Sequence, residues 1–316
     1  MASLMERSQI ESCQRTFSLH YSHFIRQTPL WKLPGKALSI DCAEVWLKLE
    51  HLQTGGSFKA RGMLNRLLSN PIPASGVIVA SGGNAGIATA AAARELGVAC
   101  EVFVPEISSP AKRARLAGLG ARVVVGGAAY ADALQACLAR QQETGALLTH
   151  AYDQPEVLVG AGTMALEIEQ QGGLPDAVLV SVGGGGLIGG VASWFGQRSR
   201  VVALEPELAP ALFRAREAGQ PVDVVVSGIA ADSLGAKRIG ALAWDVTQAQ
   251  VRDALLLTDE SIRAAQLWLW EALKIAVEPA AALPLAALQS GRYIPRANET
   301  VCLVICGANL DPASLN

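Results

Sequence analysis

The architecture of this 316-residue chain is clearest in the stretch GVIVASGGNAGIATAAAAREL, residues 76–96. An apolar run, Val77–Ala80, is followed by a glycine-rich turn ending in Asn84 and then by an alanine-rich segment that stops before Gly97. This order predicts a buried strand, a tight loop and a helix. Strands that are apolar throughout are typical of parallel sheets covered on both faces.

The same alternation of strand and helix continues along the chain and predicts an α/β fold with helices on both sides of a mostly parallel sheet. The length suggests two domains or one large one. Composition shows no boundary, and we expect a hinge near Gly55-Gly56 and a return crossing near His150. The predicted strands are 45–49, 76–80, 99–104, 122–125, 177–182, 201–204 and 301–305, and the predicted helices are 58–68, 85–96, 110–119, 130–143, 156–171, 187–198, 259–275 and 279–288.

Composition argues against several classes of protein. The net charge of −2 and the scattered basic residues argue against a nucleic-acid partner. Two long uncharged windows, residues 76–93 and 177–197, are interrupted by glycines, which argues against membrane spans. The six cysteines include no CxxC pair and no metal-like spacing with histidine, so we expect a reduced, cytoplasmic protein. The N-terminal segment MASLMERSQIESCQ is polar, which predicts neither a signal nor a transit peptide.

A single lysine has a suggestive setting in the segment GGSFKARG, Gly55–Gly62. Lys59 follows Phe58 and opens a helix-forming run directly after a flexible Gly-Gly pair. Partial burial would lower the pKa of such a lysine, and its neutral amine could then bond covalently to an aldehyde. A lone lysine in a helix is more often a solvated surface charge, so this interpretation depends on loops elsewhere in the chain.

Four consecutive glycines, Gly183–Gly186, connect a predicted strand to a helix. Their N–H groups can converge without interference from side chains, and a helix N-terminus attracts anions, so the loop predicts a phosphate site. The stretch 184–189 also satisfies the G-x-G-x-x-G pattern of dinucleotide-binding folds. Glu205 follows at about the 20-residue spacing of the ribose-binding acid in such folds. A nicotinamide-dependent oxidoreductase is therefore a competing interpretation.

The loop SGGNAG, residues 81–86, also joins a strand to a helix N-terminus. Its exposed N–H groups suit a carboxylate, and Asn84 adds a donor for a phenolate-like oxygen. A simple capping turn explains this loop equally well.

Taken together, these segments resemble the fold-type II pyridoxal phosphate enzymes, specifically the serine/threonine dehydratase and serine racemase family. The resemblance runs from about residue 25 to residue 311 and keeps the order of the family's motifs. Its motifs in this chain are LKLE at 47–50, GSFKARG at 56–62, SGGN at 81–84, HAYDQPE at 150–156, GAGT at 160–163, GGGGL at 183–187, VEPAAA at 277–282 and CGAN at 306–309.

The resemblance implies two open, twisted, mostly parallel sheet domains, similar to tryptophan synthase β, with the active site between them. Residues 1–52 and 151–316 would form a large cofactor-binding domain, and residues 53–150 a small domain. Lys59 would hold pyridoxal 5′-phosphate as a Schiff base and then act as the catalytic base. The implied cofactor contacts are Phe58 beside the ring, Asn84 at its 3′-oxygen, Gly183, Gly184, Gly185, Gly186 and Leu187 at the phosphate, Cys306 at the ring nitrogen, and Gly235 and Glu278 nearby. The implied substrate contacts are Ser81, Gly82, Gly83, Asn84 and Ala85.

Three departures from the family's pattern bear on the reaction. Cys306 is a weak hydrogen-bonding group that would leave the ring nitrogen neutral, which favours elimination over transamination. Gly82 stands where racemases carry a serine that serves as acid or base, so racemisation is disfavoured unless another group or water serves. Ala85 replaces a histidine that is common in microbial members, which leaves the substrate preference open.

No metal site is predicted from the sequence. Glu205 aligns with the start of a divalent-metal loop of some racemase-like members, but the acid expected further on falls at Ala211. Whether the protein binds a monovalent or divalent cation is left open by the sequence. The chain ends at Asn316 without room for the regulatory domain of biosynthetic threonine deaminases, so we expect no feedback control by isoleucine.

The resemblance implies an ammonia-lyase that removes water from L-serine, L-threonine or a related 3-hydroxy amino acid and releases a 2-oxo acid and ammonia. The alternatives are a serine racemase or a 3-hydroxyaspartate ammonia-lyase on the same scaffold, an NAD-dependent oxidoreductase, and a non-catalytic binding protein. The expected partners are a small amino-acid substrate and a second copy of the chain in a homodimer.

Overall fold

The computed structural model describes residues 5–315, which form two sheets. Residues 1–4 and Asn316 lie outside the described residues. The start of the polar N-terminal segment and the chain end, both considered above, are therefore outside them as well. The larger sheet has the strand order β1-β2-β10-β7-β8-β9, and the smaller one has the order β5-β4-β3-β6. The strands are β1 (Leu30–Pro34), β2 (Glu44–Lys48), β3 (Val77–Ala80), β4 (Cys100–Val104), β5 (Arg122–Val125), β6 (Leu147–Leu148), β7 (Ala177–Ser181), β8 (Arg200–Pro206), β9 (Asp253–Leu257) and β10 (Thr300–Val304).

Neighbouring strands of both sheets run parallel, with an exception at one edge of the larger sheet, where β1 pairs with β2 antiparallel. Parallel neighbours need crossover connections, and helices supply most of these. The predicted α/β fold with two mostly parallel sheets is therefore confirmed.

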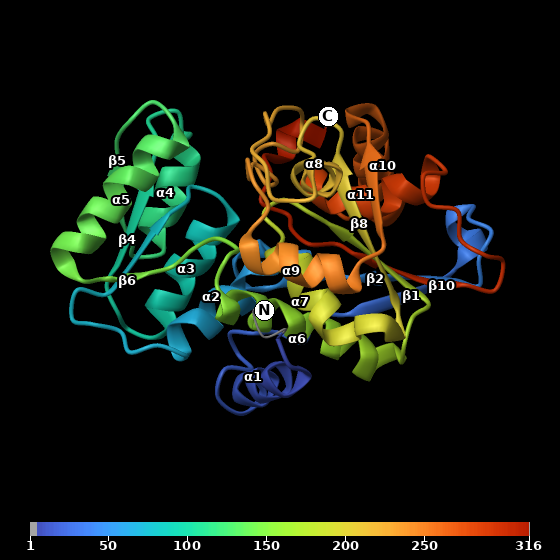
Figure 1. Cartoon of the computed structure of the whole chain (residues 1–316), viewed down its shortest axis with the longest axis horizontal. Helices are drawn as coiled ribbons and strands as arrows, with labels where there is room; N and C mark the ends of the chain where they lie inside the picture. Colours follow the sequence, from blue (N-terminus) through green and yellow to red (C-terminus); the bar gives the residue numbers. More distant parts are fainter. Residues whose placement is uncertain (1–4, 316) are drawn as a thin grey trace.

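Helices cover both faces of the larger sheet (Figure 1). Figure 1 shows α10 and α11 on one side of it and α6 and α7 on the other, with α1 packed against α6. Helix α2 contacts both α3 and α6 and so lies where the two sheets approach each other. The helices are α1 (Arg7–His20), α2 (Lys59–Leu68), α3 (Asn84–Glu95), α4 (Pro110–Gly118), α5 (Tyr130–Thr144), α6 (Pro155–Gly172), α7 (Gly186–Phe195), α8 (Ala211–Ala218), α9 (Ala241–Gln250), α10 (Asp259–Leu273) and α11 (Pro279–Gln289).

The central strand β3 is buried on both faces, because alternate residues of a strand point to opposite sides. Val77 and Val79 belong to the main hydrophobic core together with Ile87 on α3. Ile78 packs in a second cluster with Cys137 on α5. The uninterrupted apolar run of this strand therefore reflects two covered faces, as the sequence predicted.

The predicted elements agree with the observed ones to within one residue at most ends, apart from two helix ends and strand β8, which continues to Pro206 instead of ending at 204. The helix expected to reach Arg198 ends at Phe195, because Gly196 has a φ of 55° and a short 3-10 turn follows. The helix expected to reach Ile275 ends at Leu273, because Lys274 adopts a left-handed φ of 57°. The elements without a prediction are α1, α8, α9, β1, β6 and β9.

Within residues 5–315, none of the helices is both long enough and apolar enough to cross a membrane. The two uncharged windows divide instead into strand and helix, β3 with α3 and β7 with α7.

Candidate active site

Two neighbouring strands of the larger sheet bring two of the predicted motifs together. Strands β7 and β10 pair in parallel, so their carboxyl ends lie at the same edge of the sheet. The four glycines follow β7, and Cys306 follows β10. This edge is where α/β sheets usually bind their ligands.

The segment before Lys59 is held against the segment after β10. The N–H group of Phe58 donates to the carbonyl oxygen of Cys306 at 3.1 Å. Gly56 must be a glycine here, because its φ is 76° and a Cβ would lie 2.6 Å from Oδ1 of Asn309. As a result Lys59, the first residue of α2, lies beside Cys306 although the two are far apart in the sequence.

The Lys59 side chain is half-buried and lines a pocket. Its Nζ donates to the carbonyl oxygen of Ala151 at 2.6 Å and lies 5.0 Å from the centre of the Phe58 ring. Burial lowers the pKa of Lys59 to about 8, although Cys306 and Glu278 oppose the shift. More of this amine is neutral near pH 7 than in a surface lysine, and the neutral amine is the form that attacks an aldehyde.

The four glycines form the turn into α7. Gly185 has a φ of 92°, in the region that favours glycine. At Gly184 a Cβ would overlap the ring of Tyr152, so a side chain would displace that ring. Because Gly185 has no side chain that could cap α7, the first N–H groups of the helix can serve an anion. The loop therefore fits a phosphate group.

Asn84, at the start of α3, is held by two residues from the C-terminal part of the chain. Its Nδ2 donates to Oε1 and Oε2 of Glu278 at 2.8 and 3.1 Å, and its Oδ1 accepts from Nδ2 of Asn309 at 2.5 Å. Burial raises the pKa of Glu278 to about 7, and the hydrogen bond from Asn84 opposes this shift. The two N–H bonds of an amide diverge, so a single N–H points between the two oxygens of Glu278. These contacts therefore orient the amide and leave the other N–H of Asn84 for a further acceptor.

The Cys306 thiol is buried at the same pocket. Burial raises the pKa of this thiol, and Glu278 adds to the shift. The thiol therefore stays protonated at neutral pH and offers only weak hydrogen bonds.

The pocket contains most of the residues predicted to bind a cofactor, and several without a prediction. Tyr152 lies in the predicted motif at 150–156, and Ser181 lies two residues before Gly183, so both were within reach of the sequence patterns. The predicted lining residues are Phe58, Lys59, Asn84, Gly183, Gly184, Gly185, Gly186, Leu187, Glu278 and Cys306, and the further ones are Tyr152, Ser181, Ser233, Leu234 and Ala280.

A few predicted residues do not line this pocket. Gly235 is not among the described lining residues, although the two residues before it are. Four of the five predicted substrate residues flank Asn84 but stay outside the lining, and their roles remain predictions. These are Ser81, Gly82, Gly83 and Ala85.

Comparison with known proteins identifies the family. Residues 21–307 match the family described as pyridoxal-phosphate dependent enzyme. The chain belongs to this family. It is 37% identical over 310 residues to an L-threonine ammonia-lyase of Geobacter sulfurreducens, across 96% of this chain and 73% of the relative.

Two solved structures are similar to this pyridoxal-phosphate dependent enzyme over nearly its whole length. A threonine deaminase from T.th. has a TM-score of 0.88 and 33% identity, and the match covers 97% of this chain and 99% of that one. A maize serine racemase has a TM-score of 0.90 and 26% identity, with 99% and 96% covered. The predicted family, the pyridoxal phosphate cofactor and the class of ammonia-lyase or dehydratase are confirmed.

Glu205 does not act as the ribose-binding acid that the dinucleotide interpretation requires. It is buried, and its carboxylate oxygens accept the N–H groups of Leu212 and Phe213 at 2.7 Å each, which caps α8. The family match excludes the oxidoreductase alternative. Among residues 5–315, no three or more His, Cys, Asp or Glu side chains are grouped as a metal ion would need.

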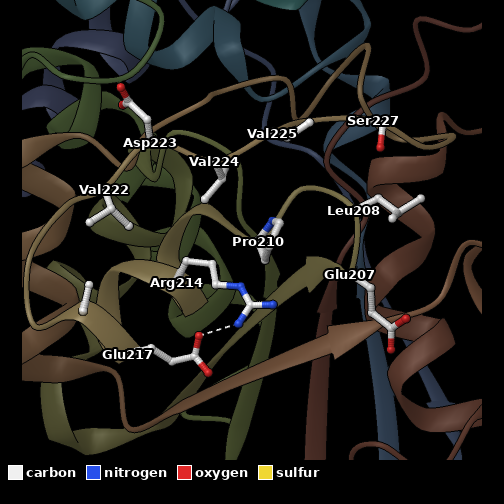
Figure 2. A pocket seen from close by; sticks show the side chains of 11 residues that line it. Glu207, Leu208, Pro210, Arg214, Glu217, Val222, Asp223, Val224, Val225 and Ser227 are labelled. Atoms are coloured by element: carbon white, nitrogen blue, oxygen red, sulfur yellow. Dashed lines mark hydrogen bonds and ion pairs between the residues drawn. The ribbon is translucent and has the colours of Figure 1, made fainter.

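A second, more open groove lies beside α8 and shares no lining residue with the Lys59 pocket (Figure 2). Its basic residue Arg214 pairs with Glu217 at 2.5 Å, and the acids Glu207 and Asp223 line it as well. An acidic groove of this kind does not suit the phosphate or carboxylate groups of the expected ligands.

Proposed function

We propose that this pyridoxal-phosphate dependent enzyme eliminates water from L-threonine or L-serine and releases a 2-oxo acid and ammonia, with Lys59 as its catalytic residue. The observation that supports this most directly is the half-buried Lys59 amine with a pKa of about 8, in one pocket with the glycine loop. The 37% identity to an L-threonine ammonia-lyase supports the substrate class.

The residues of the pocket suit each part of the cofactor. The N–H groups of Gly183–Leu187 would bind its phosphate, because they form the turn into α7 and its first residues, and no side chain caps this helix. The free N–H of Asn84 would donate to the ring oxygen, Phe58 would pack beside the ring, and Cys306 would face the ring nitrogen. Bound pyridoxal phosphate supplies an aldehyde that condenses with amines and a ring that withdraws electrons from the carbon next to them.

Lys59 would perform two tasks in turn. With the cofactor bound, Nζ would hold its aldehyde group until the substrate amine takes that place. The freed, neutral Nζ would then accept the α-proton, and the electron pair of that C–H bond would form the Cα–Cβ double bond as the C–O bond to the β-hydroxyl breaks. The hydroxyl needs one proton to leave as water, and Nζ, which has gained the α-proton, can return it. A pKa near 8 suits this role, since the amine can both accept and return a proton near neutral pH.

Glu278 and Asn309 would keep the Asn84 amide in one orientation, because they occupy its carbonyl oxygen and one N–H. We also propose that Ser81, Gly82, Gly83 and Ala85 bind the substrate carboxylate. Their position around Asn84, at the N-terminus of α3, supports this assignment. Gly235 would support the cofactor site indirectly, because the neighbouring Ser233 and Leu234 line the pocket.

Racemisation of serine is the second candidate function. Gly82 has no hydroxyl, but Oγ of Ser108 would lie 3.2 Å from a Cβ at position 82. A hydroxyl is thus close to the place where the sequence lacks one. Chiral analysis of L-serine after incubation separates the two functions, and a D-serine signal that Ser108→Ala abolishes would favour the racemase.

The test of the main proposal is an oxo-acid release assay with the holoenzyme over L-threonine, L-serine and L-3-hydroxyaspartate, with a visible spectrum recorded in parallel. We expect the fastest release from L-threonine or L-serine and a yellow protein whose colour borohydride removes, with the reduced cofactor on the peptide that contains Lys59. A protein that forms no oxo acid from any of these substrates would contradict the proposal.

We further propose a large domain of residues 1–52 and 151–316, a small domain of residues 53–150, and a cytoplasmic homodimer. All strands of the smaller sheet lie between Val77 and Leu148, which supports the small domain. All six cysteines are buried free thiols, which supports a reducing compartment. Light scattering of the holoenzyme tests the dimer, and a monomer at micromolar concentration would contradict it.

A further inference from the structure

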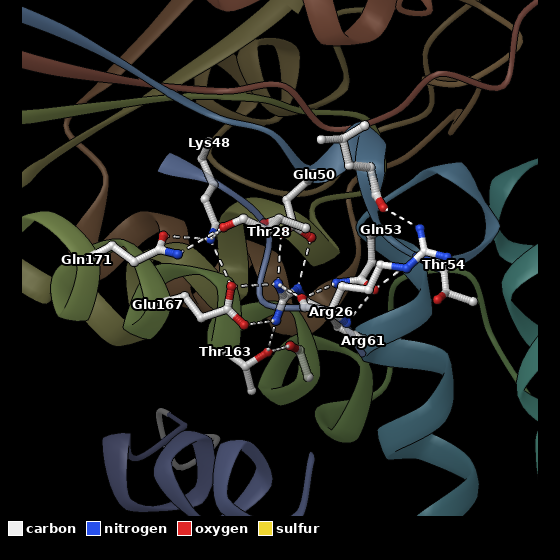
Figure 3. Close-up of polar contacts among 12 residues, drawn as sticks. Arg26, Thr28, Lys48, Glu50, Gln53, Thr54, Arg61, Thr163, Glu167 and Gln171 are labelled. Carbon is white, nitrogen blue, oxygen red and sulfur yellow. Dashed lines mark hydrogen bonds and ion pairs between the residues drawn. The ribbon is translucent and has the colours of Figure 1, made fainter. Parts of the chain in front are cut away.

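A second buried polar region lies across α2 from the pocket. Successive residues of a helix are about 100° apart, so Arg61 points to nearly the opposite side of α2 from Lys59. Arg61 is 0% exposed. Figure 3 shows its guanidinium among side chains from β2 and the turn after it, from α6, and from the segment before β1.

The Arg61 guanidinium has acceptors for all of its N–H groups. Nε and Nη2 donate to Oε2 and Oε1 of Glu50 at 2.8 Å each. Nη1 and Nη2 donate to Oε1 and Oε2 of Glu167 at 2.8 and 2.9 Å. Nη1 also donates to Oγ1 of Thr163 at 3.2 Å. Two carboxylates therefore clamp two edges of one planar group, which a lysine ammonium cannot reproduce.

The charges in this cluster balance. Lys48 is also 0% exposed and donates from Nζ to Oε2 of Glu167 at 2.8 Å and to the carbonyl oxygen of Thr28 at 2.8 Å. Lys48 and Arg61 together match Glu50 and Glu167, so the cluster buries no net charge. Buried pairs that are matched and fully hydrogen-bonded hold their geometry, because any displacement leaves a charge unpaired.

The cluster joins three elements through one residue of α2. Glu50 belongs to the short 3-10 turn after β2, and Glu167 and Thr163 belong to α6. Arg61 lies in the first turn of α2, which begins at Lys59. The position of the Lys59 backbone thus depends on a clamp that touches neither the pocket nor the substrate.

We propose that Arg61 is a positioning residue for Lys59. Its clamp on Glu50 and Glu167 keeps the first turn of α2 in register with the glycine loop and with Cys306, so that Nζ of Lys59 reaches the reacting carbon. This proposal rests on the function proposed above for Lys59. A misplacement of about 1 Å in a reacting group can cost about 100-fold in rate, so a loosened clamp affects catalysis more than binding.

The test is Arg61→Lys in the holoenzyme, which keeps the charge and removes the two-edged clamp. We expect kcat to fall about 10- to 100-fold with KM changed less than about threefold. We also expect the pH midpoint of the bound cofactor's visible absorbance to shift, and hydrogen exchange at the first turn of α2 to accelerate. An unchanged kcat and an unchanged midpoint would overturn the proposal.

Lys48→Met is the matched control. Lys48 is equally buried in the same cluster and pairs with the same Glu167, but it lies on β2 and not on α2. We expect this variant to lower the urea midpoint at least as much as Arg61→Lys while kcat and the absorbance midpoint stay within about twofold of the wild type. Equal losses of kcat in the two variants would mean that the cluster acts only through overall stability, which overturns the proposal.

A milder pair of variants covers the case in which Arg61→Lys does not fold. Thr163→Val removes one acceptor of Arg61, and Gln171→Met removes one acceptor of Lys48, and both residues lie on α6. We expect a two- to fivefold loss of kcat and a shifted absorbance midpoint in Thr163→Val alone. The same result in both variants, or in neither, overturns the proposal.

Borohydride trapping of the wild type separates this proposal from the function on which it rests. If the wild type does not trap the cofactor on Lys59, the proposed function fails. If it does, and the Arg61 variants behave like the wild type, only the positioning role fails.

Discussion

Lys59 is half-buried and Arg61 is fully buried, two residues apart on α2, and their surroundings push their pKa values in opposite directions. Burial lowers the pKa of Lys59 to about 8, and its amine donates to a neutral carbonyl oxygen. Burial also disfavours the charge of Arg61, but Glu50 and Glu167 reverse this effect and raise its pKa above the usual value.

The difference shows that burial alone does not decide whether a charge persists. Carboxylates in hydrogen-bond contact keep Arg61 charged and immobile, which suits an anchor. A carbonyl partner leaves Lys59 near the point at which it loses its proton, which suits a nucleophile and base. The predictions that follow change one side of this comparison at a time.

The largest expected effect is that of Lys59→Ala. We expect oxo-acid release to fall by roughly 1,000-fold or more and the covalently bound cofactor to be lost, because no other amine replaces Nζ. Lys59→Arg is the control: it keeps a positive charge that cannot be removed at neutral pH, and we expect it to be equally inactive. Activity in the arginine variant would mean that charge and not deprotonation is what the site requires.

Glu50→Gln tests the buried charge cluster around Arg61. We expect the free energy of unfolding in urea to fall by about 3–5 kcal/mol, because Arg61 and Lys48 would then share Glu167 alone and one buried positive charge would stay unmatched. Glu101→Gln is the matched control, since Glu101 pairs with the more exposed Arg122 and Arg140 at the surface. We expect that control to cost less than about 1 kcal/mol. Similar losses in the two variants would contradict a special role of the buried cluster.

The pH dependence of cofactor uptake tests the Lys59 side. Its pKa lies at about 8, below the usual value for lysine, so the amine is protonated below that pH and neutral above it. We therefore expect the initial rate at which apoenzyme takes up pyridoxal phosphate to fall about tenfold for each pH unit below 8 and to level off above it. A rate that keeps rising through pH 10 would show that the pKa of Lys59 is not lowered.

The smallest expected effect is that of Glu278→Gln. The Glu278 carboxylate favours the protonated form of Lys59 and so opposes the lowering of its pKa. The neutral amide removes this influence, so the midpoint of the uptake profile should move below pH 8, by less than about one unit. Asp232→Asn serves as a control at a more exposed carboxylate, which is not among the groups that shift the pKa of Lys59. A midpoint that moves upward would contradict the assignment.

Several features of the fold were predictable from local patterns. The apolar run of β3 and the glycine turns at 81–86 and 183–186 indicate strand, loop and helix through short-range sterics and hydrophobic periodicity. The edge strand β1 escaped prediction because its burial is incomplete, and α1 because its sequence is largely polar. Tertiary contacts, and not local preference, stabilise such elements.

By itself the sequence determined the order of the strands and helices with clear local patterns, the anion-binding shape of the glycine loop and the chemical type of the reactive group at Lys59, because each depends on neighbouring residues alone. Tertiary structure decided which carboxylates contact which amide and cationic side chains. Asn84 meets Glu278 across 194 positions, and Arg61 meets Glu167 across 106. The pKa values of Lys59 and Arg61 depend on such distant partners and on burial, so no local pattern could assign one residue to chemistry and the other to anchorage.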